Sequence, residues 1–213
     1  MTRSDRTHLY FLLDRSGSMQ SIKSDIEGGF AAFIEEQRKG DGECLASLSQ
    51  FDDVYEVVYA DKPVRDVPPL DLQPRNMTAL HDAMGRMITD AGARLAALPD
   101  DQRPGTVIVA IMTDGLENAS HEWHAPAIKA LVELQTSTYN WEFLYMGADQ
   151  DAVEVGAGLG IAAANSVTFA KGKAREAMAT SAGKISQLRK HRLHDPAAPM
   201  PAYTQAERRN LAE

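Results

Sequence analysis

Two aspartates and three hydroxyl residues stand out as possible ligands of a metal ion. Asp14 is followed by Ser16 and Ser18 in the spacing D-x-S-x-S, and Asp114 lies in a T-D-G sequence. Thr78 lies between these two stretches, just before an expected helix. Carboxylates and hydroxyls are hard oxygen donors, which suit Mg²⁺, Mn²⁺ or Ca²⁺ and not Zn²⁺ or copper. These residue types predict a divalent-cation site, if the fold brings the five side chains together.

Each aspartate follows a run of apolar residues. Residues 8–13 precede Asp14, and residues 106–112 lead through a threonine to Asp114. Short continuous apolar runs are typical of strands that are buried on both faces of a parallel sheet. Open α/β sheets bind ligands outside the carboxyl ends of their strands, so two neighbouring strands would place both carboxylates in one crevice. Without a cation, the two carboxylates would repel each other.

Such a site would leave room for a ligand from outside the chain. Mg²⁺ prefers about six oxygen ligands in an octahedral arrangement, and the five side chains supply fewer. If the hydroxyls bind the ion directly and a carboxylate binds it through water, the ion keeps positive character and attracts an external carboxylate. We therefore expect a protein partner that offers an Asp or Glu side chain to the open position.

Enzymatic alternatives are a metal-dependent phosphohydrolase and a serine hydrolase. Aspartate phosphatases need a second aspartate two residues after the first, where this chain has Ser16. A serine nucleophile needs a base, but the sequence places no histidine beside Ser16 or Ser18, and it lacks a G-x-S-x-G elbow. We expect a binding protein and not an enzyme. A metal-independent scaffold, in which Ser18 only caps a helix, is the other alternative.

The rest of the chain alternates between strand and helix patterns. Apolar residues at three- and four-residue steps predict amphipathic helices between the strands. Residues 44–51 and 54–60 are expected to pair as an antiparallel hairpin, with Asp52 and Asp53 as its turn. Further strands are expected at residues 140–146 and 166–169. This order predicts an α/β protein, a three-layer αβα sandwich around a mostly parallel six-stranded sheet with one antiparallel edge strand.

Length and composition favour a single domain. The 213 residues suffice for one full core, and we expect residues 1–193 to form one domain, with its core at 7–170 and a final helix at about 172–193. The apolar row of this helix favours packing on the sheet, and its basic outer face offers partner contact as an alternative. Residues 194–213 are rich in Pro and Ala, which predicts a flexible C-terminal tail.

Charge and cysteine content limit the class of partner and the compartment. The net charge of −8 argues against a nucleic-acid partner. No apolar run approaches the ~20 residues needed to span a bilayer, and the polar N-terminal residues do not resemble a signal peptide. The single Cys44 excludes an internal disulfide and fits a reducing compartment. We expect a cytoplasmic protein without nucleic-acid or membrane partners; its oligomeric state stays open.

Three further motifs carry weaker signals. His121 and His124 are three residues apart, unlike the H-E-x-x-H of zinc proteases, and no further ligand follows at a suitable spacing. The glycines of residues 156–160 do not form a dinucleotide-binding motif and are expected to end a helix. For Glu117 and Asn118 the sequence leaves two roles open: they shape the rim of the metal site, or they lie at an exposed helix start.

The combined pattern resembles the von Willebrand factor A domain and matches its metal-ion-dependent adhesion site. The features that carry this resemblance are D-x-S-x-S after the first strand, a threonine before the second main helix, and T-D-G after an apolar strand. It implies a doubly wound sheet, commonly in strand order 3-2-1-4-5-6, and a role in protein–protein interaction. It also implies that Ser16, Ser18 and Thr78 bind the metal ion, with Asp14 and Asp114 acting directly or through water.

Within this family, the chain looks most like small intracellular bacterial and phage proteins, including those linked to tellurite resistance. The segments FLLDRSGSM, TDGLENAS and FLYMGADQDA carry this likeness. The resemblance to the family extends over about residues 7–170.

Overall fold

A six-stranded sheet forms the middle layer of the protein. The computed structural model describes residues 3–213, so residues 1 and 2 of the expected domain lie outside the described residues. The strands lie in the order β3-β2-β1-β4-β5-β6, and only β3 runs antiparallel to its neighbour. The strands are β1 (Arg3–Asp14), β2 (Glu43–Phe51), β3 (Tyr55–Pro63), β4 (Pro104–Thr113), β5 (Glu142–Ala148) and β6 (Ser166–Phe169). The predicted α/β class, the mostly parallel sheet and the antiparallel edge strand are confirmed.

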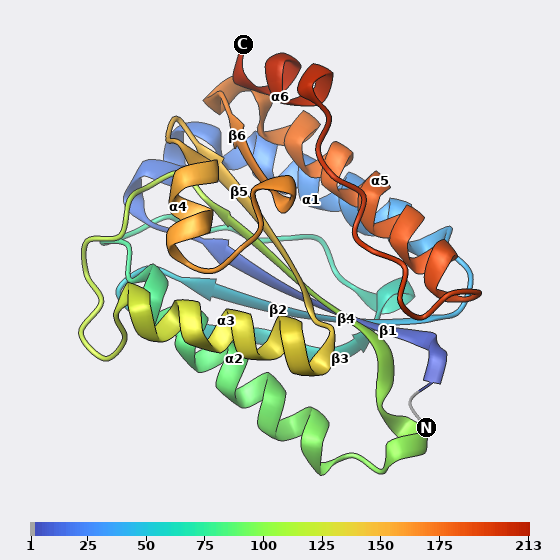
Figure 1. The fold of residues 1–213 in the computed structure, drawn as a ribbon. Helices are drawn as coiled ribbons and strands as arrows, with labels where there is room; N and C mark the ends of the chain where they lie inside the picture. The colour runs from blue at the N-terminus through green and yellow to red at the C-terminus, as the bar shows by residue number, and fades with distance from the viewer. Residues whose placement is uncertain (1–2) are drawn as a thin grey trace.

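Helices cover both faces of this sheet (Figure 1). On one face lie α1 (Lys23–Arg38) and α5 (Ala174–Arg192), and on the other lie α2 (Leu80–Ala97) and α3 (Ala125–Tyr139). The shorter helices are α4 (Ala152–Gly158) and α6 (Gln205–Ala212). Within residues 3–213, no helix combines the length and the apolar character needed to cross a membrane.

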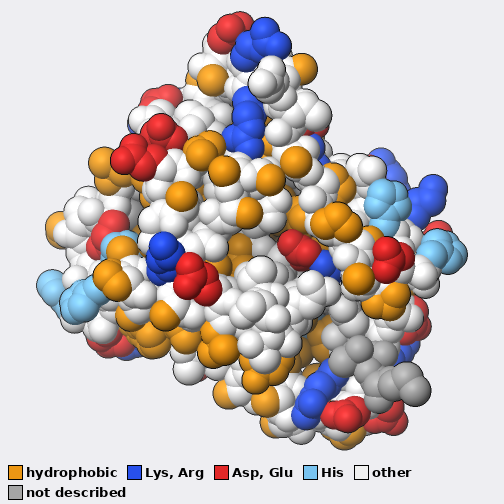
Figure 2. Space-filling view, viewed as in Figure 1, with side chains coloured by type: hydrophobic (Ala, Val, Ile, Leu, Met, Phe, Trp, Pro, Cys, Tyr) orange, Lys and Arg blue, Asp and Glu red, His pale blue; other side chains and the backbone are white. Residues whose placement is uncertain are grey.

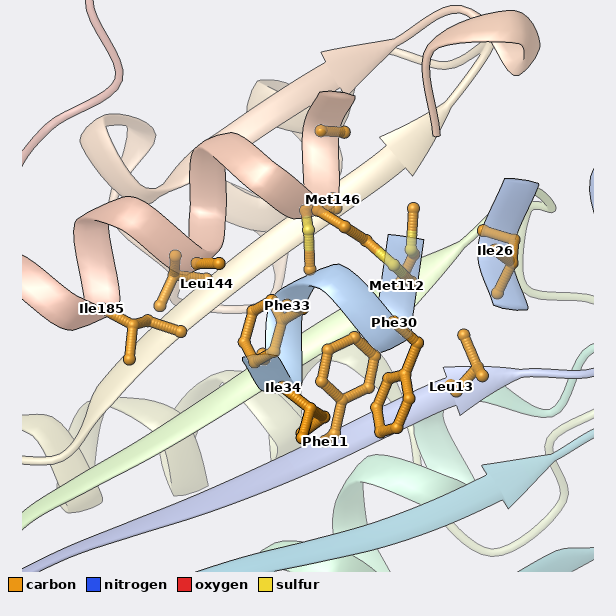
Figure 3. Close-up of a cluster of buried hydrophobic side chains, with 14 of the residues drawn as sticks. Phe11, Leu13, Ile26, Phe30, Phe33, Ile34, Met112, Leu144, Met146 and Ile185 are labelled. Atoms are coloured by element: carbon orange, nitrogen blue, oxygen red, sulfur yellow. The ribbon is translucent and has the colours of Figure 1, made fainter. Parts of the chain in front are cut away.

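The central strands are apolar on both faces because both faces are covered. In β1, Phe11 points toward α1 and packs edge-to-face against Phe30 and Phe33, with ring centroids 5.2 and 5.3 Å apart (Figure 3). Leu12 belongs to the core on the opposite face, together with residues of α2 and α3. Burial of successive residues explains why the run before Asp14 does not alternate between apolar and polar residues.

Two glycines let α1 approach α5 closely. A Cβ atom added at Gly29 would lie 2.8 Å from the Sδ of Met178 and 3.2 Å from the Cα of Arg175. At Gly28, an added Cβ atom would meet the guanidinium of Arg175 at 2.6 Å. Close packing, and not a helix break, therefore accounts for this glycine pair.

The C-terminal segment differs from the flexible tail expected for residues 194–213. Tyr203 and Leu211 are buried, and the backbone N–H of Ala170 donates to the carbonyl of Leu211 at 2.8 Å. The expected cap of α6 is present, since Thr204 and Glu207 form a reciprocal capping box. The apolar side chains of this segment are few, but they pack directly on α5 and β6. Composition alone does not show this packing and therefore predicted a flexible tail.

The face of the molecule seen in Figure 2 carries charges of both signs. Lys and Arg side chains lie among Asp and Glu side chains, with apolar side chains between them. The charge on this face is therefore mixed and does not form one field of a single sign.

Candidate functional site

The two aspartates of the predicted site lie at the ends of adjacent strands. Asp14 is the last residue of β1, and Asp114 directly follows β4. The two strands pair in parallel up to Leu13 and Met112. The carboxylates therefore reach the same edge of the sheet, as their positions after apolar strands predicted.

The D-x-S-x-S loop connects the two carboxylates through hydrogen bonds. The backbone N–H of Ser16 donates to Asp14 Oδ1 at 2.6 Å, and the hydroxyls of Ser16 and Ser18 lie 3.1 Å apart. Ser18 Oγ donates to Asp114 Oδ1 at 2.5 Å. Ser18 lies within a 3₁₀ turn, Gly17–Ile22, so it does not cap the helix as in the scaffold alternative.

Gly115 leaves a small space open between three of the candidate ligands. A Cβ atom added at Gly115 would lie 3.1 Å from Thr78 Oγ1, 3.8 Å from Ser18 Oγ and 3.9 Å from Asp14 Oδ2. Oxygens from the loop after β1 and from the loop before α2 therefore lie within 3.9 Å of one point beside Gly115. We call this space the Gly115 cradle.

Backbone hydrogen bonds hold Thr78 at the cradle. The N–H of Thr78 donates to Asn118 Oδ1 at 2.9 Å, and the N–H of Asn118 donates to the carbonyl of Thr78 at 3.0 Å. The N–H of Gly17 donates to the carbonyl of Asn76 at 3.2 Å. The loop before α2 is thus tied both to the loop after β1 and to the loop after β4.

Glu117 connects the loop after β4 to the first turn of α2. Its carboxylate accepts hydrogen bonds from the backbone N–H groups of His81, Ala119 and Ser120, at 2.7 to 2.9 Å, and from the Ser120 hydroxyl at 2.8 Å. Burial alone would raise the pKa of Glu117, but these hydrogen bonds bring the pKa below its usual value. Glu117 therefore holds the loop at the rim of the candidate site in place, which is one of the two roles considered from the sequence, and its side chain is only 20% exposed.

A cluster of ion pairs around one buried carboxylate, which the sequence did not reveal, supports the loop after β1. The carboxylate of Asp52 lies 3.0 Å from Arg15 Nε and 2.6 Å from Arg75 Nε, and it is fully buried. Burial opposes ionisation of Asp52, but the hydrogen bond from Arg75 and the charge of Arg15 contribute to a pKa below the usual value. Asp52 also accepts from the N–H of Val54 at 2.7 Å, as expected for the hairpin turn.

The two aspartates at the cradle differ from these supporting residues, Asp14 in its pKa and Asp114 in its hydrogen bonding. Asp14 is fully buried, and burial raises its pKa to about 6, against the hydrogen bonds from Thr113 and Ser16 and with a further increase from the charge of Asp114. Asp114 Oδ2 is buried and accepts no hydrogen bond from any residue that the structure describes. Lys171 Nζ lies 3.6 Å from this oxygen. A buried acceptor without a partner is costly, and native structures contain few of them.

The donor set fits a hard cation better than a transition metal. The candidate ligands are two carboxylates and three hydroxyls, and the cradle is a space that a single Cβ atom would enter. Within residues 3–213 there is no cluster of three or more His, Cys, Asp or Glu side chains that could hold a metal ion. His121 and His124 are exposed. The hydroxyls must therefore supply part of any coordination.

The other sequence motifs have structural roles. Gly160 has a φ of +82° and follows the end of α4, which agrees with the expected helix termination. Trp123, between the two histidines, packs so closely on Gly85 that a Cβ atom there would lie 2.3 Å from its ring. Cys44 is buried in β2.

Comparisons with known proteins agree on the fold. No protein-family model matches the sequence, and a search of curated proteins also finds no match. Among solved structures, the ArnB paralog VWA2 from Sulfolobus acidocaldarius aligns at a TM-score of 0.56 and 12% identity, over 82% of this chain and 44% of its own. A von Willebrand factor type A protein from Catenulispora acidiphila aligns at a TM-score of 0.56 and 15% identity, over 86% and 43%.

A third solved structure is the pilus adhesin SpaC from Lactobacillus rhamnosus GG. It aligns at a TM-score of 0.60 and 13% identity, over 85% of this chain and 30% of the adhesin. This chain therefore spans less than half the length of these three proteins. The chain has a von Willebrand factor A-type fold, as the sequence resemblance implied.

Proposed function

We propose that this chain is a divalent-cation-binding module that binds a protein partner through a carboxylate of that partner. The observation that carries the proposal is the Gly115 cradle, where oxygens of Asp14, Ser18 and Thr78 lie within 3.9 Å of one point. Asp114 and Ser16 complete the proposed ligand set, which is the metal-ion-dependent adhesion site of the resemblance. A bound cation would offset the cost of two buried carboxylates. The ion would be Mg²⁺, with Mn²⁺ and Ca²⁺ as alternatives.

The surroundings of the cradle favour a protein as the partner. Met77 precedes Thr78 and is 52% exposed, and Leu116 follows Gly115 and is 63% exposed. Large apolar side chains on the loops that form the site would contact a partner whose Asp or Glu reaches the ion. The fold is also found in a pilus adhesin, which gives a precedent for binding on this scaffold. We propose a binding role without catalysis.

Calorimetric titration with Mg²⁺, Mn²⁺ and Ca²⁺ tests the metal site. We expect the wild type to bind at least one of these ions, and Asp14→Ala and Thr78→Ala to lose most of the affinity. Ser21→Ala is the matched control, because Ser21 lies in the same turn as Ser18 but bonds only the carbonyl of Ser18 at 3.1 Å. Equal metal affinity of the wild type and Asp14→Ala would contradict the proposed site. A melting temperature that EDTA does not change would favour the metal-independent scaffold.

The enzymatic alternative has a separate test. Metal-dependent turnover of generic phosphate or ester substrates, abolished in Ser16→Ala, would replace the binding role by a hydrolase.

The cellular setting belongs to the same proposal. Cys44 and the three segments that resemble small bacterial and phage proteins support a cytoplasmic location. A pull-down from the native host with and without EDTA would identify the partner: capture that EDTA abolishes supports a metal-dependent complex, and capture that EDTA leaves unchanged contradicts it.

A further inference from the structure

Lys171 brings a positive charge to the candidate site from the C-terminal part of the chain. It opens the 3₁₀ turn Lys171–Lys173, which connects β6 to α5. Its Nζ atom lies 3.6 Å from Asp114 Oδ2. The Lys171 side chain is 39% exposed, whereas the Asp114 side chain is completely buried. The ammonium therefore lies between the solvent and a buried carboxylate.

The contact is an ion pair without a hydrogen bond. Asp114 Oδ1 already accepts from Ser18, and Oδ2 accepts no hydrogen bond from the residues that the structure describes. A distance of 3.6 Å between Nζ and Oδ2 exceeds the usual hydrogen-bond range. Lys171 thus offsets the charge of Asp114 without satisfying its oxygen, and its flexible stem lets the ammonium move into water at little cost.

We propose that Lys171 is the resident cation of the metal-free site and competes with the divalent ion for Asp114. The inference rests on the proposed function, because it concerns how the same site selects its cation. Both cations would neutralise the charge of Asp114. Two positive charges at one carboxylate repel each other, so each cation lowers the affinity of the site for the other. The lysine weakens metal binding and keeps the metal-free carboxylate from being buried without a counter-charge.

Calorimetry with Mn²⁺ tests this competition in the full chain. We expect Lys171→Met to bind Mn²⁺ about two- to fivefold more tightly than the wild type, the range expected for a partly exposed ion pair. Lys173→Met is the matched control, because Lys173 belongs to the same turn but makes no ion pair with Asp114 among the described residues. Lys171→Arg keeps the charge and should retain the wild-type affinity.

Thermal melts give a second readout that does not depend on a partner. In EDTA, Lys171→Met should have a lower melting temperature than the wild type, because Asp114 loses its counter-charge. At saturating Mn²⁺, the melting temperature of the variant should equal or exceed that of the wild type. Unchanged or weaker Mn²⁺ binding by Lys171→Met, with normal binding by the wild type, would overturn the competition and leave the metal site standing. Absence of Mn²⁺ binding by both proteins would overturn the metal site and the competition together.

Discussion

Substituting Gly115 by Ala tests whether a cation lies in the cradle. The added methyl group would lie 3.1 Å from Thr78 Oγ1, somewhat closer than an ordinary carbon–oxygen contact. Thr78 needs to move by only a few tenths of an ångström, so we expect a stability cost below about 1 kcal/mol. The φ of Gly115 lies outside the left-handed region, so Ala fits the backbone.

The same methyl group would have a much larger effect on metal binding. Oxygen ligands bind Mg²⁺ at about 2.0–2.1 Å and Ca²⁺ at about 2.3–2.6 Å, so an ion between the three oxygens and a methyl group cannot share the space. We expect Gly115→Ala to weaken binding at least about tenfold, which corresponds to ~1.4 kcal/mol. Calorimetric titration with Mg²⁺ and Mn²⁺ measures this loss, and urea denaturation measures the stability.

Gly172→Ala provides the matched control for this experiment. Gly172 lies next to Lys171, and a Cβ atom added there would meet no heavy atom within 4 Å. This variant should bind metal as the wild type does. If Gly115→Ala also binds Mg²⁺ and Mn²⁺ with wild-type affinity, no ion lies in the cradle, and the reasoning from its geometry is refuted.

Three further perturbations probe the supports, the C-terminal segment and the rim. Asp52→Asn should destabilise the fold by about 2 kcal/mol in urea denaturation, since it removes one of the two carboxylates that pair with the buried guanidinium of Arg15, the other being Glu56 at 2.6 Å. Because the folded pKa of Asp52 is lowered, the difference from the wild type should persist above about pH 4 and shrink as the pH falls through the folded pKa. A constant difference down to pH 2 would contradict this role. Leu211→Ala should lower the free energy of unfolding by about 3 kcal/mol in the same assay, because the side chain is completely buried. A change near zero would instead support the flexible tail expected from the sequence. Leu116→Ser should leave Mn²⁺ affinity unchanged but reduce recovery of the partner in a pull-down, and equal recovery would exclude Leu116 from the interface.

The sheet and the placement of the candidate ligands after β1 and β4 were predictable because their signals are local. The runs before Asp14 and Asp114 are apolar at successive positions, as burial on both faces requires. The spacing from Asp14 to Ser18 places two hydroxyls on one tight loop whatever the rest of the chain does. The position of Thr78 relative to these loops depended on the family resemblance, since no local rule brings residues so far apart in sequence together.

The supporting residues were not predictable for a physical reason. Asp52 looks like an ordinary turn residue, and its partners Arg15 and Arg75 are 37 and 23 positions away in sequence. Glu117 likewise looks like a solvated loop acid until α2 is placed beside it. The structural role of such a charged residue depends on partners from other helices, strands or loops. A single sequence does not show which distant residues will pair. The packing of the C-terminal segment was not predicted for the same reason. Its apolar residues are few, and the sequence does not show that β6 and α5 lie beside them.

The acidic residues around the site differ in how far hydrogen bonds and ion pairs compensate the charge of each carboxylate. Asp52 and Glu117 are supplied with guanidinium or N–H donors, and their pKa values lie below the usual range. Asp14, at the end of β1, has a pKa raised to about 6, and Asp114, three residues before Glu117, has a buried oxygen without a hydrogen bond among the described residues. Both oxygens of Asp14 accept hydrogen bonds, from Ser16 and Thr113, so the unpartnered acceptor at the cradle is the Oδ2 atom of Asp114. Under the proposed function, a cation from outside the chain would complete the charge balance of these two carboxylates.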